Sequence, residues 1–454
     1  MAMAVDLEEP YKKIYRDYQN VLCGKSTDVL NSQRAKAYEL FDKVGFPTIK
    51  TEAYRHTNLQ EALAVDYGMN INRVNPVVNA KDLFKCQVQG INSYVFFVVN
   101  DTFYCPDENL KDLEELRSMG VMVGSLAEYA KNEPETVAKF YNKQELKKDS
   151  FVAFNTVFAQ DGFFLYVPKN VNLPRPVQLI SVMYAGAPLM ANERDLIVLE
   201  EGSQAQLLVC THTVGETQTF ANRVTEVYVG ENATYDHYKL EGTNAKTVSV
   251  GSVYIRQEAN SNVLVNDITL QNGVSRNNIV MDLEGEGCES QLCGMAVTDK
   301  KEHIDNFTIL NHNKPKCKSN EMYKYVLDGE STGVFSGRIY VEPGAQKTEA
   351  YQVNRNVCLK PTARMFTQPQ LEIYADDVKC SHGASTGVMD DNAMFYLRSR
   401  GIPEAEAKML LMYAFVNDVV ENVRIEAVKE KIKQMVEMRF RGELSKCSGC
   451  SVCR

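Results

Sequence analysis

The chain contains no tryptophan and only six histidines in 454 residues. It also lacks an excess of basic side chains, because 59 acidic residues outnumber 50 Lys and Arg and leave a net charge of -9. Nucleic-acid binding needs clustered positive charge, so this balance argues against a DNA or RNA partner. The longest apolar run, residues 94–99, is far shorter than the roughly 20 residues of a membrane helix. With no apolar signal-peptide core at the N-terminus, we expect a soluble, cytoplasmic protein without a membrane partner.

Cysteine, by contrast, is plentiful. Twelve cysteines in a chain without a secretory signal are typical of reduced thiols and argue against a disulfide framework. A hydrophobic content of 44% is ordinary for a globular protein. The length suffices for about three domain-sized units, or for one large core with appendages.

The texture of the sequence changes near residue 150. Residues 1–150 have a mainly helical pattern, with helices favoured at residues 30–44 and 125–146 and one strand-like insert at residues 93–103. From residue 151 to 375, short β-branched and aromatic runs alternate with Gly, Asn and Asp turns, and no segment there predicts a helix. The clearest predicted strands are residues 205–214, 224–229, 247–256, 263–270, 278–283, 307–310 and 335–341. Such a series fits a sandwich, a barrel or a parallel β-helix, and without a clean repeat the pattern does not choose among them.

The C-terminal region, residues 376–446, holds two helical patterns after Pro403, which suits a first helical position. Apolar residues at helical spacing form a first stripe of Ala407, Leu410, Leu411, Ala414, Phe415 and Val419. A second stripe, ending before Gly442, consists of Ile425, Val428, Ile432, Met435 and Phe440. These stripes either pack against the body of the protein or contact a partner.

A soft thiol, an imidazole and two carboxylates fall within seven residues, at Asp376, Asp377, Cys380 and His382, and such side chains are suited to iron or zinc. The alternation of Leu371 to Ala375 predicts a strand just before them. If the chain stays extended, Cys380 and His382 share a face with Cα atoms roughly 6.6 Å apart, too far for easy closure on one ion. We therefore expect one of three arrangements. The chain turns near Gly383, or each residue ligates a different metal atom, or another chain completes the site. The two aspartates fit a solvated turn equally well.

Three catalytic or nucleotide-binding motifs can be weighed directly. A cysteine hydrolase would need its base within hydrogen-bond reach of the sulfur, which neighbouring positions on a strand supply poorly. Residues 23–27 contain the GKS core of a P-loop, but Gln19 replaces its first glycine and no strand precedes it. Residues 285–290 lack the third glycine of a dinucleotide fingerprint. We expect no ATP hydrolysis by this chain. Cys288 and Cys293 are predicted to be buried thiols.

The tail, residues 447–454, carries Cys447, Cys450 and Cys453. Their spacing matches three ligands of a ferredoxin-type run, and thiolates select zinc, copper(I) or iron–sulfur clusters. A fourth ligand is missing locally. Metal binding and a flexible, oxidation-prone tail are the two interpretations.

The run YADDVKCSHGAS, residues 374–385, followed by FYLRSRGI, residues 395–402, closely resembles the SufD branch of the SufB/SufD family of iron–sulfur cluster assembly scaffolds. A second match is GFPTIKTEAYRHTNL, where Tyr54 replaces the usual Trp and His56 the usual Tyr. SufB sequences read Glu-His-Glu-Ala around the equivalent histidine, whereas this chain reads Ser-His-Gly-Ala, which favours SufD. The resemblance implies a right-handed parallel β-helix core, residues 151–375, flanked by helical N- and C-terminal regions.

The resemblance also implies a non-catalytic role in a complex with SufB and the ATPase SufC. His382 would supply an imidazole, and Cys380 a nearby thiol, to a transient iron or nascent iron–sulfur cluster at the SufB interface. The C-terminal helices would hold SufC, with exposed members of the two stripes as contacts; our candidates are Leu411, Phe415, Val419 and Ile425. Reduced flavin in the complex and a homodimer of the isolated chain are further expectations.

Two other functions remain open. A SufB-like chain would accept persulfide sulfur from a cysteine desulfurase. A β-helical enzyme acting on polysaccharides would need a groove with several acidic residues, which Asp376 and Asp377 could join. The lack of a secretory signal and the Cys-His pairing argue against such an enzyme.

Overall fold

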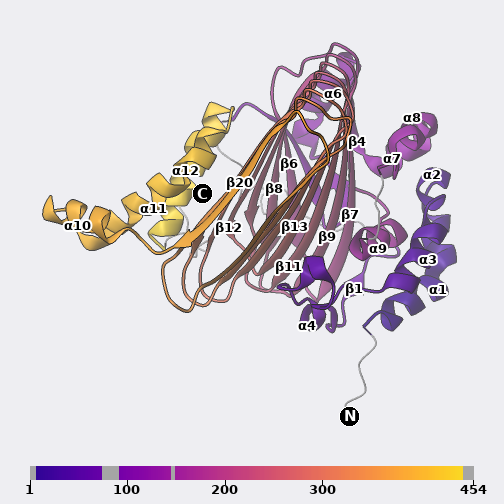
Figure 1. Ribbon diagram of the computed structural model, residues 1–454. Coiled ribbons are helices and arrows are strands. Elements are labelled where there is room, and N and C mark those ends of the chain that lie inside the picture. Colours follow the sequence, from indigo (N-terminus) through magenta and orange to yellow (C-terminus); the bar gives the residue numbers. More distant parts are fainter. Residues whose placement is uncertain (1–6, 74–90, 145–148, 443–454) are drawn as a thin grey trace.

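The computed structural model describes residues 7–73, 91–144 and 149–442. Its centre is a β-solenoid of about seven turns in which successive strands alternate between two sheets (Figure 1). This confirms the predicted parallel β-helix with flanking helices.

Sheet A contains β4 (Met122–Ser125), β5 (Phe163–Val167), β7 (Leu189–Leu199), β9 (Thr219–Val229), β11 (Thr247–Gln257), β13 (Val274–Leu283), β15 (His303–His312), β17 (Thr332–Val341) and β19 (Arg364–Ile373), with β1 (Gly68–Met69) beside β7. Sheet B contains β3 (Thr102–Tyr104), β2 (Tyr94–Val99), β6 (Val177–Tyr184), β8 (Gln204–Val214), β10 (Thr234–Gly242), β12 (Asn262–Gln271), β14 (Glu289–Thr298), β16 (Lys318–Leu327), β18 (Glu349–Cys358) and β20 (Lys379–Gly387).

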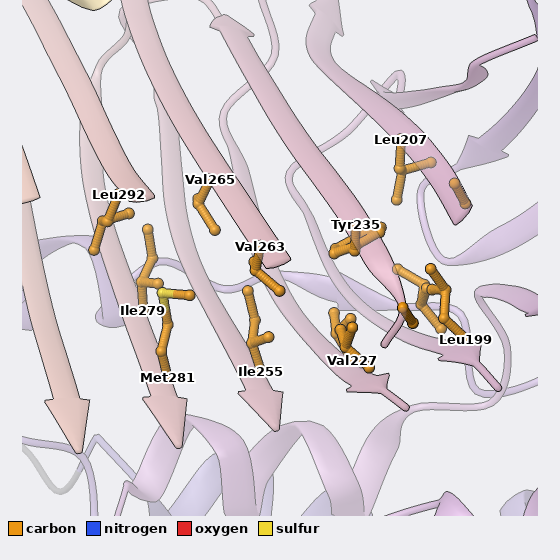
Figure 2. Close-up of a cluster of buried hydrophobic side chains, with 14 of the residues drawn as sticks. Leu199, Leu207, Val227, Tyr235, Ile255, Val263, Val265, Ile279, Met281 and Leu292 are labelled. Carbon is orange, nitrogen blue, oxygen red and sulfur yellow. The ribbon is translucent and has the colours of Figure 1, made fainter. Parts of the chain in front are cut away.

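The space between the sheets is filled by alternate side chains of each strand. Figure 2 shows part of this core, where aliphatic and aromatic side chains from both sheets meet. The labelled members are Leu199, Leu207, Val227, Tyr235, Ile255, Val263, Val265, Ile279, Met281 and Leu292. Because each strand pairs in register with the strand two places along the chain, every inward side chain lies above one from the coil below.

One backbone position marks almost every coil. At the turn that leads from sheet A to sheet B, a residue with positive φ donates its backbone N–H to a carbonyl of the next coil. The residues at this position are Asn170, Gly202, Asn232, Asn260, Gly287, Lys316 and Lys347. Glycine and asparagine tolerate this left-handed conformation, and here two lysines adopt it as well. The turn therefore repeats in the structure, although no single residue type repeats at this position in the sequence.

Helices of the N-terminal region cover one side and one end of the solenoid. They are α1 (Glu9–Gly24), α2 (Asp28–Asn31), α3 (Arg34–Val44), α4 (Gln60–Leu63), α6 (Leu110–Ser118), α7 (Leu126–Asn132), α8 (Pro134–Phe140) and α9 (Ser150–Phe158), with the 3-10 turns η1 (Glu52–Tyr54) and η3 (Asp107–Asn109). The expectation of no helix after residue 151 is wrong for α9. All nine residues of α9 are buried, so it has no polar face, and its periodicity could not be distinguished from that of a buried strand.

Three helices follow the last strand: α10 (Asp391–Ser399), α11 (Glu404–Glu421) and α12 (Glu426–Phe440). The buried faces of α11 and α12 pack on the outer face of sheet B, where Val416 and Val428 join a core with strand residues such as Leu264. No residue of α10 is buried, and Figure 1 shows this helix projecting away from the body at the left. Among the residues that the structure describes, no helix is long and apolar enough to cross a membrane.

Candidate functional site at the open end of the solenoid

Within the part of the chain that the structure describes, no strand lies over the last coil of the solenoid, β19 and β20. Its inward side chains are those in register with buried residues of the coil below, such as Ile373 above Val341 and His382 above Gln352. They are Met365, Thr367, Pro369, Leu371 and Ile373 on β19, and Cys380, His382, Ala384 and Thr386 on β20. Although Ile373 points inward, it is 38% exposed, whereas Val341 is fully buried. The interior of the β-helix is therefore open to solvent at this end.

The strand geometry corrects the turn expected near Gly383. β20 continues straight through that glycine to Gly387, so the solenoid extends beyond the expected boundary at residue 375. The turn instead lies between β19 and β20, at residues 374–378, where both aspartates are exposed. The main chain of Asp377 joins the stacked turns: its N–H donates to Oε1 of Gln346, and its carbonyl accepts from the N–H of Lys347.

Cys380 and His382 share the inward face of β20, two residues apart. Cys380 is half-buried and packs against the solenoid core, and this burial raises the pKa of its thiol. His382 is exposed at the open end. Among the described residues, no three His, Cys, Asp or Glu side chains gather closely enough to hold a metal ion. The two side chains thus present a thiol and an imidazole at an opening, and any metal site there needs ligands from elsewhere.

Two polar residues beneath this site could not be identified from the sequence. Gln352 is the register partner of His382, and Glu321 is the partner of Gln352 one coil further in. Both point into the solenoid and are buried. Burial raises the pKa of the Glu321 carboxyl to about 7, although two hydrogen bonds oppose the shift. Only the strand register, which the sequence did not reveal, places them behind His382.

The apolar stripes of α11 and α12 contribute mostly to packing. Val419 is fully buried, which corrects its assignment as an exposed contact residue. Phe415 and Ile425 are half-buried and pack against the sheet B core, with Lys324 5.2 Å above the ring of Phe415. Leu411 is half-buried. The exposed apolar surface lies instead on and before α10, where Val388, Phe395 and Tyr396 are 76%, 75% and 58% exposed.

The second sequence motif, at residues 45–59, docks the N-terminal region onto the outer face of sheet A. The Tyr54 ring lies under the Arg276 guanidinium at 4.4 Å, and Arg276 pairs with Asp305. The Thr57 hydroxyl donates to that aspartate. The neighbouring His56 ring stacks on Phe366 of β19 at 4.0 Å. This motif therefore has a structural role that ties the N-terminal region to the last coils.

The remaining motifs carry no catalytic geometry. Residues 24–27 join helix α1 to α2 rather than a strand to a helix, as a P-loop requires. Residues 285–288 form a turn between strands β13 and β14. Cys288 and Cys293 are fully buried thiols, as predicted. Cys447, Cys450 and Cys453 lie outside the described residues.

Together the fold and the site define a parallel β-solenoid protein that presents a cysteine and a histidine on the inward face of its last strand. Comparison with known proteins agrees with this class. A family model described as the SUF system FeS cluster assembly SufBD core domain matches residues 182–415, and the SufBD protein N-terminal region matches residues 5–179. The chain belongs to the SufBD family of iron–sulfur cluster assembly proteins.

Relatives with SufD names are similar over most of the chain. An iron–sulfur cluster assembly SufBD family protein of Synechocystis is 27% identical, with 93% of each chain covered. SufD of Escherichia coli is 27% identical over 88% of this chain and 90% of its own. SufD of Bacillus subtilis is 28% identical over 72% and 76%. These findings confirm the resemblance to SufD and set aside the polysaccharide-acting alternative.

Proposed function

We propose that this protein is a non-catalytic scaffold subunit of a Suf complex, in which it joins a SufB-like partner and a SufC-like ATPase. The observation that carries the proposal is the uncapped last coil with its inward Cys380 and His382. In this proposal the partner covers that coil and supplies the missing ligands. Iron and sulfide are the substrates that meet between the two chains, and this chain hydrolyses no ATP.

The edges of the last coil favour a β-rich partner. In each sheet the outer strand offers a row of backbone groups along about ten residues, and such edges readily pair with another chain. Pro369 in the middle of β19 suits an edge strand, because proline cannot donate to a ladder. A SufB-like solenoid seated here would bury the exposed apolar interior as well as the edges.

The chemistry of the two side chains suits transient binding. A thiolate and a neutral imidazole are both ligands for iron, and their spacing prevents this chain alone from enclosing an ion. Because burial raises the pKa of Cys380, its thiol holds its proton more tightly than an exposed cysteine. His382, exposed and able to act as a neutral ligand, is therefore the principal donor, and Cys380 is secondary.

Helix α10 is the proposed contact for the ATPase. Its exposed Phe395 and Tyr396 lie within the FYLRSRGI motif, and aromatic side chains commonly anchor protein interfaces. Arg400 lies 5.2 Å from the ring centroid of Tyr396 and adds positive charge at the same surface. Since α11 and α12 use their apolar faces against sheet B, α10 is the better candidate.

The test is anaerobic cluster assembly by the reconstituted complex with His382→Ala, using Ser381→Ala as the matched control on the outward face of the same strand. We expect complex formation with both variants and loss of cluster formation only with His382→Ala. Normal assembly by His382→Ala would overturn the assigned site. Co-purification of a SufC-like ATPase supports the scaffold role. Efficient persulfide transfer to this chain from a cysteine desulfurase would instead favour the SufB-like alternative, and a homodimer through the last coil would show that a second copy covers it.

A further inference from the structure

Some of the side chains inside the solenoid near its open end are polar and buried. His382 is paired in register with Gln352, and both side chains point toward the space between the sheets. Gln352 is only 1% exposed, whereas His382 is open to solvent. In-register neighbours on parallel strands lie about 4.8 Å apart, which lets their side chains meet. The amide of Gln352 therefore belongs to the residue directly beneath His382 in the strand register.

The side chain of Glu321, one coil further into the solenoid, fixes the orientation of the Gln352 amide. Nε2 of Gln352 donates to Oε2 of Glu321 at 2.6 Å, and the hydroxyl of Thr308 donates to Oε1 of the same carboxylate. At pH 8 the Glu321 side chain, whose pKa burial raises to about 7, is mainly a carboxylate that only accepts hydrogen bonds, so the amide must turn its NH₂ group toward it. Oε1 of Gln352 consequently points elsewhere, and this buried oxygen has no hydrogen-bond partner among the residues that the structure describes.

A glycine on the opposite sheet makes room for this arrangement. Gly337 of β17 faces the amide, and a Cβ at this position would overlap Nε2 of Gln352 and lie 3.0 Å from Oγ1 of Thr308. Glycine weakens a strand interior, so its presence here indicates a need for space. The Gln352 amide and the space left by Gly337 together form an ordered polar site behind His382. An orphaned buried acceptor destabilises the fold and therefore calls for a donor.

We propose that Gln352 is a positioning residue for His382: its Oε1 accepts the ring N–H of the neutral imidazole and leaves the lone pair of the other ring nitrogen facing the opening. Glu321 and Thr308 hold the amide in the orientation that this requires. The inference deepens the proposed function and rests on it for the identity of the metal. In histidines that bind a metal through one ring nitrogen, the N–H of the other ring nitrogen commonly donates a hydrogen bond to a nearby acceptor. This hydrogen bond fixes the tautomer.

The tautomer of His382 can be measured in the free protein. With six histidines in the chain, ¹⁵N-histidine labelling gives few signals, and His382→Asn identifies the one of interest. At pH 8 we expect one tautomer to be favoured by about 3- to 10-fold relative to the ratio in free histidine, as one net hydrogen bond predicts. Gln352→Met keeps the length of the side chain and should return the ratio to that of free histidine. Glu321→Gln frees the amide to rotate and should give an intermediate ratio.

Asn354→Leu is the matched control, because Asn354 is equally buried on the same strand but lies beneath Ala384. It should leave the His382 tautomer unchanged. If Gln352→Met fails to fold, Glu321→Gln still tests the proposal. An unbiased tautomer in the wild type, or one unaffected by both Gln352→Met and Glu321→Gln, would overturn the positioning role.

Iron binding separates this inference from the proposed function. In the assembled complex, Gln352→Met should weaken Fe(II) binding by about 10- to 100-fold, as loss of an outer-shell partner does elsewhere. If the tautomer depends on Gln352 but His382→Ala leaves cluster assembly intact, the positioning stands and the proposed function fails. If cluster assembly depends on His382 but the tautomer of His382 does not depend on Gln352, the proposed function stands and the positioning role fails.

Discussion

The two ends of the solenoid are terminated in opposite ways. At the N-terminal end, each sheet finishes with an antiparallel strand, β3 beside β2 and β4 beside β5. Helix α6 runs between these two strands in the chain, and its Leu113 and Leu116 are buried in the solenoid core. At the C-terminal end both sheets finish with parallel strands, and their inward side chains are open to solvent.

This difference supports the proposed interface without reference to any single residue. A solenoid needs a cap at each end to keep its interior dry and its edges unpaired. Among the described residues, 94–125 form a cap at one end and none form a cap at the other, where the chain turns away into α10, α11 and α12. The end without a cap is also the end that carries Cys380 and His382. We interpret the missing cap as the place of the partner.

The largest expected effect comes from matched leucine truncations at the two ends. Leu116→Ala removes a fully buried side chain of the cap and should lower the free energy of unfolding by about 2 to 5 kcal/mol. Leu371→Ala at the open end removes a half-buried side chain and should cost about 1 kcal/mol or less in the isolated chain. Urea unfolding of both variants gives the comparison. Equal costs would mean that the open end is as well packed as the cap.

The second prediction measures how far water enters from the open end. Burial raises the pKa of Glu321 to about 7, from an ordinary value of 4.5. Between these values the folded protein keeps a proton that the unfolded chain releases, so the contribution of Glu321 to stability falls as pH rises from 4.5 to 7 and is then constant. The loss is roughly 3 kcal/mol.

Glu321→Gln removes this titration, so its unfolding free energy should fall less steeply than that of the wild type between pH 5 and 7. Urea unfolding at intervals of one pH unit checks this. Subtracting the unfolding free energy of the variant from that of the wild type at each pH removes the contributions of the other titrating groups. Parallel profiles would mean that solvent from the open end already reaches Glu321, in the third coil from that end.

Much of the fold could be predicted because strand signals are local. Alternation of β-branched residues located strands such as residues 205–214 and 247–256, and the family resemblance then chose the β-helix. The repeat itself was hidden, because the left-handed turn position is occupied by Asn in some coils, Gly in others and Lys in two. The buried helix α9 was missed for a related reason, since it has no polar face.

The site could be predicted only in part. The motif around residues 374–385 indicated Cys380 and His382, and extended geometry indicated that they could not close on one ion. Gln352 and Glu321 lie 30 and 61 residues earlier than His382, and only the register of three strands brings them together. Nothing in a single sequence reports that register when the repeat is irregular. The stripe containing Val419 was ambiguous, because packing and partner contact require the same apolar spacing.

The third prediction contrasts two glycines, one within the closed part and one at the open end. A Cβ on Gly294 of β14 would overlap the ring of Tyr323, so Gly294→Ala should cost about 1 to 3 kcal/mol through overpacking. A Cβ on Gly383 of β20 would meet nothing within 4 Å, so Gly383→Ala should change stability by about 0.5 kcal/mol or less. Thermal unfolding of the two variants tests this. A large loss for Gly383→Ala would show that another element packs on the last strand.

The smallest effect on the isolated chain is expected at α10, and it separates stability from assembly. Phe395 is 75% exposed, so Phe395→Ser should change the free energy of unfolding by about 0.5 kcal/mol or less. As an aromatic anchor it should nevertheless contribute about 2 kcal/mol to binding of the ATPase, so that the variant binds roughly 30-fold more weakly. Tyr18→Ser removes another exposed aromatic side chain, from α1, and should leave that affinity unchanged. Titration calorimetry with the SufC-like subunit distinguishes the two variants. Because no residue of α10 is buried while α11 and α12 are anchored to sheet B, unchanged affinity for Phe395→Ser would move the ATPase contact away from the projecting helix and back toward the solenoid.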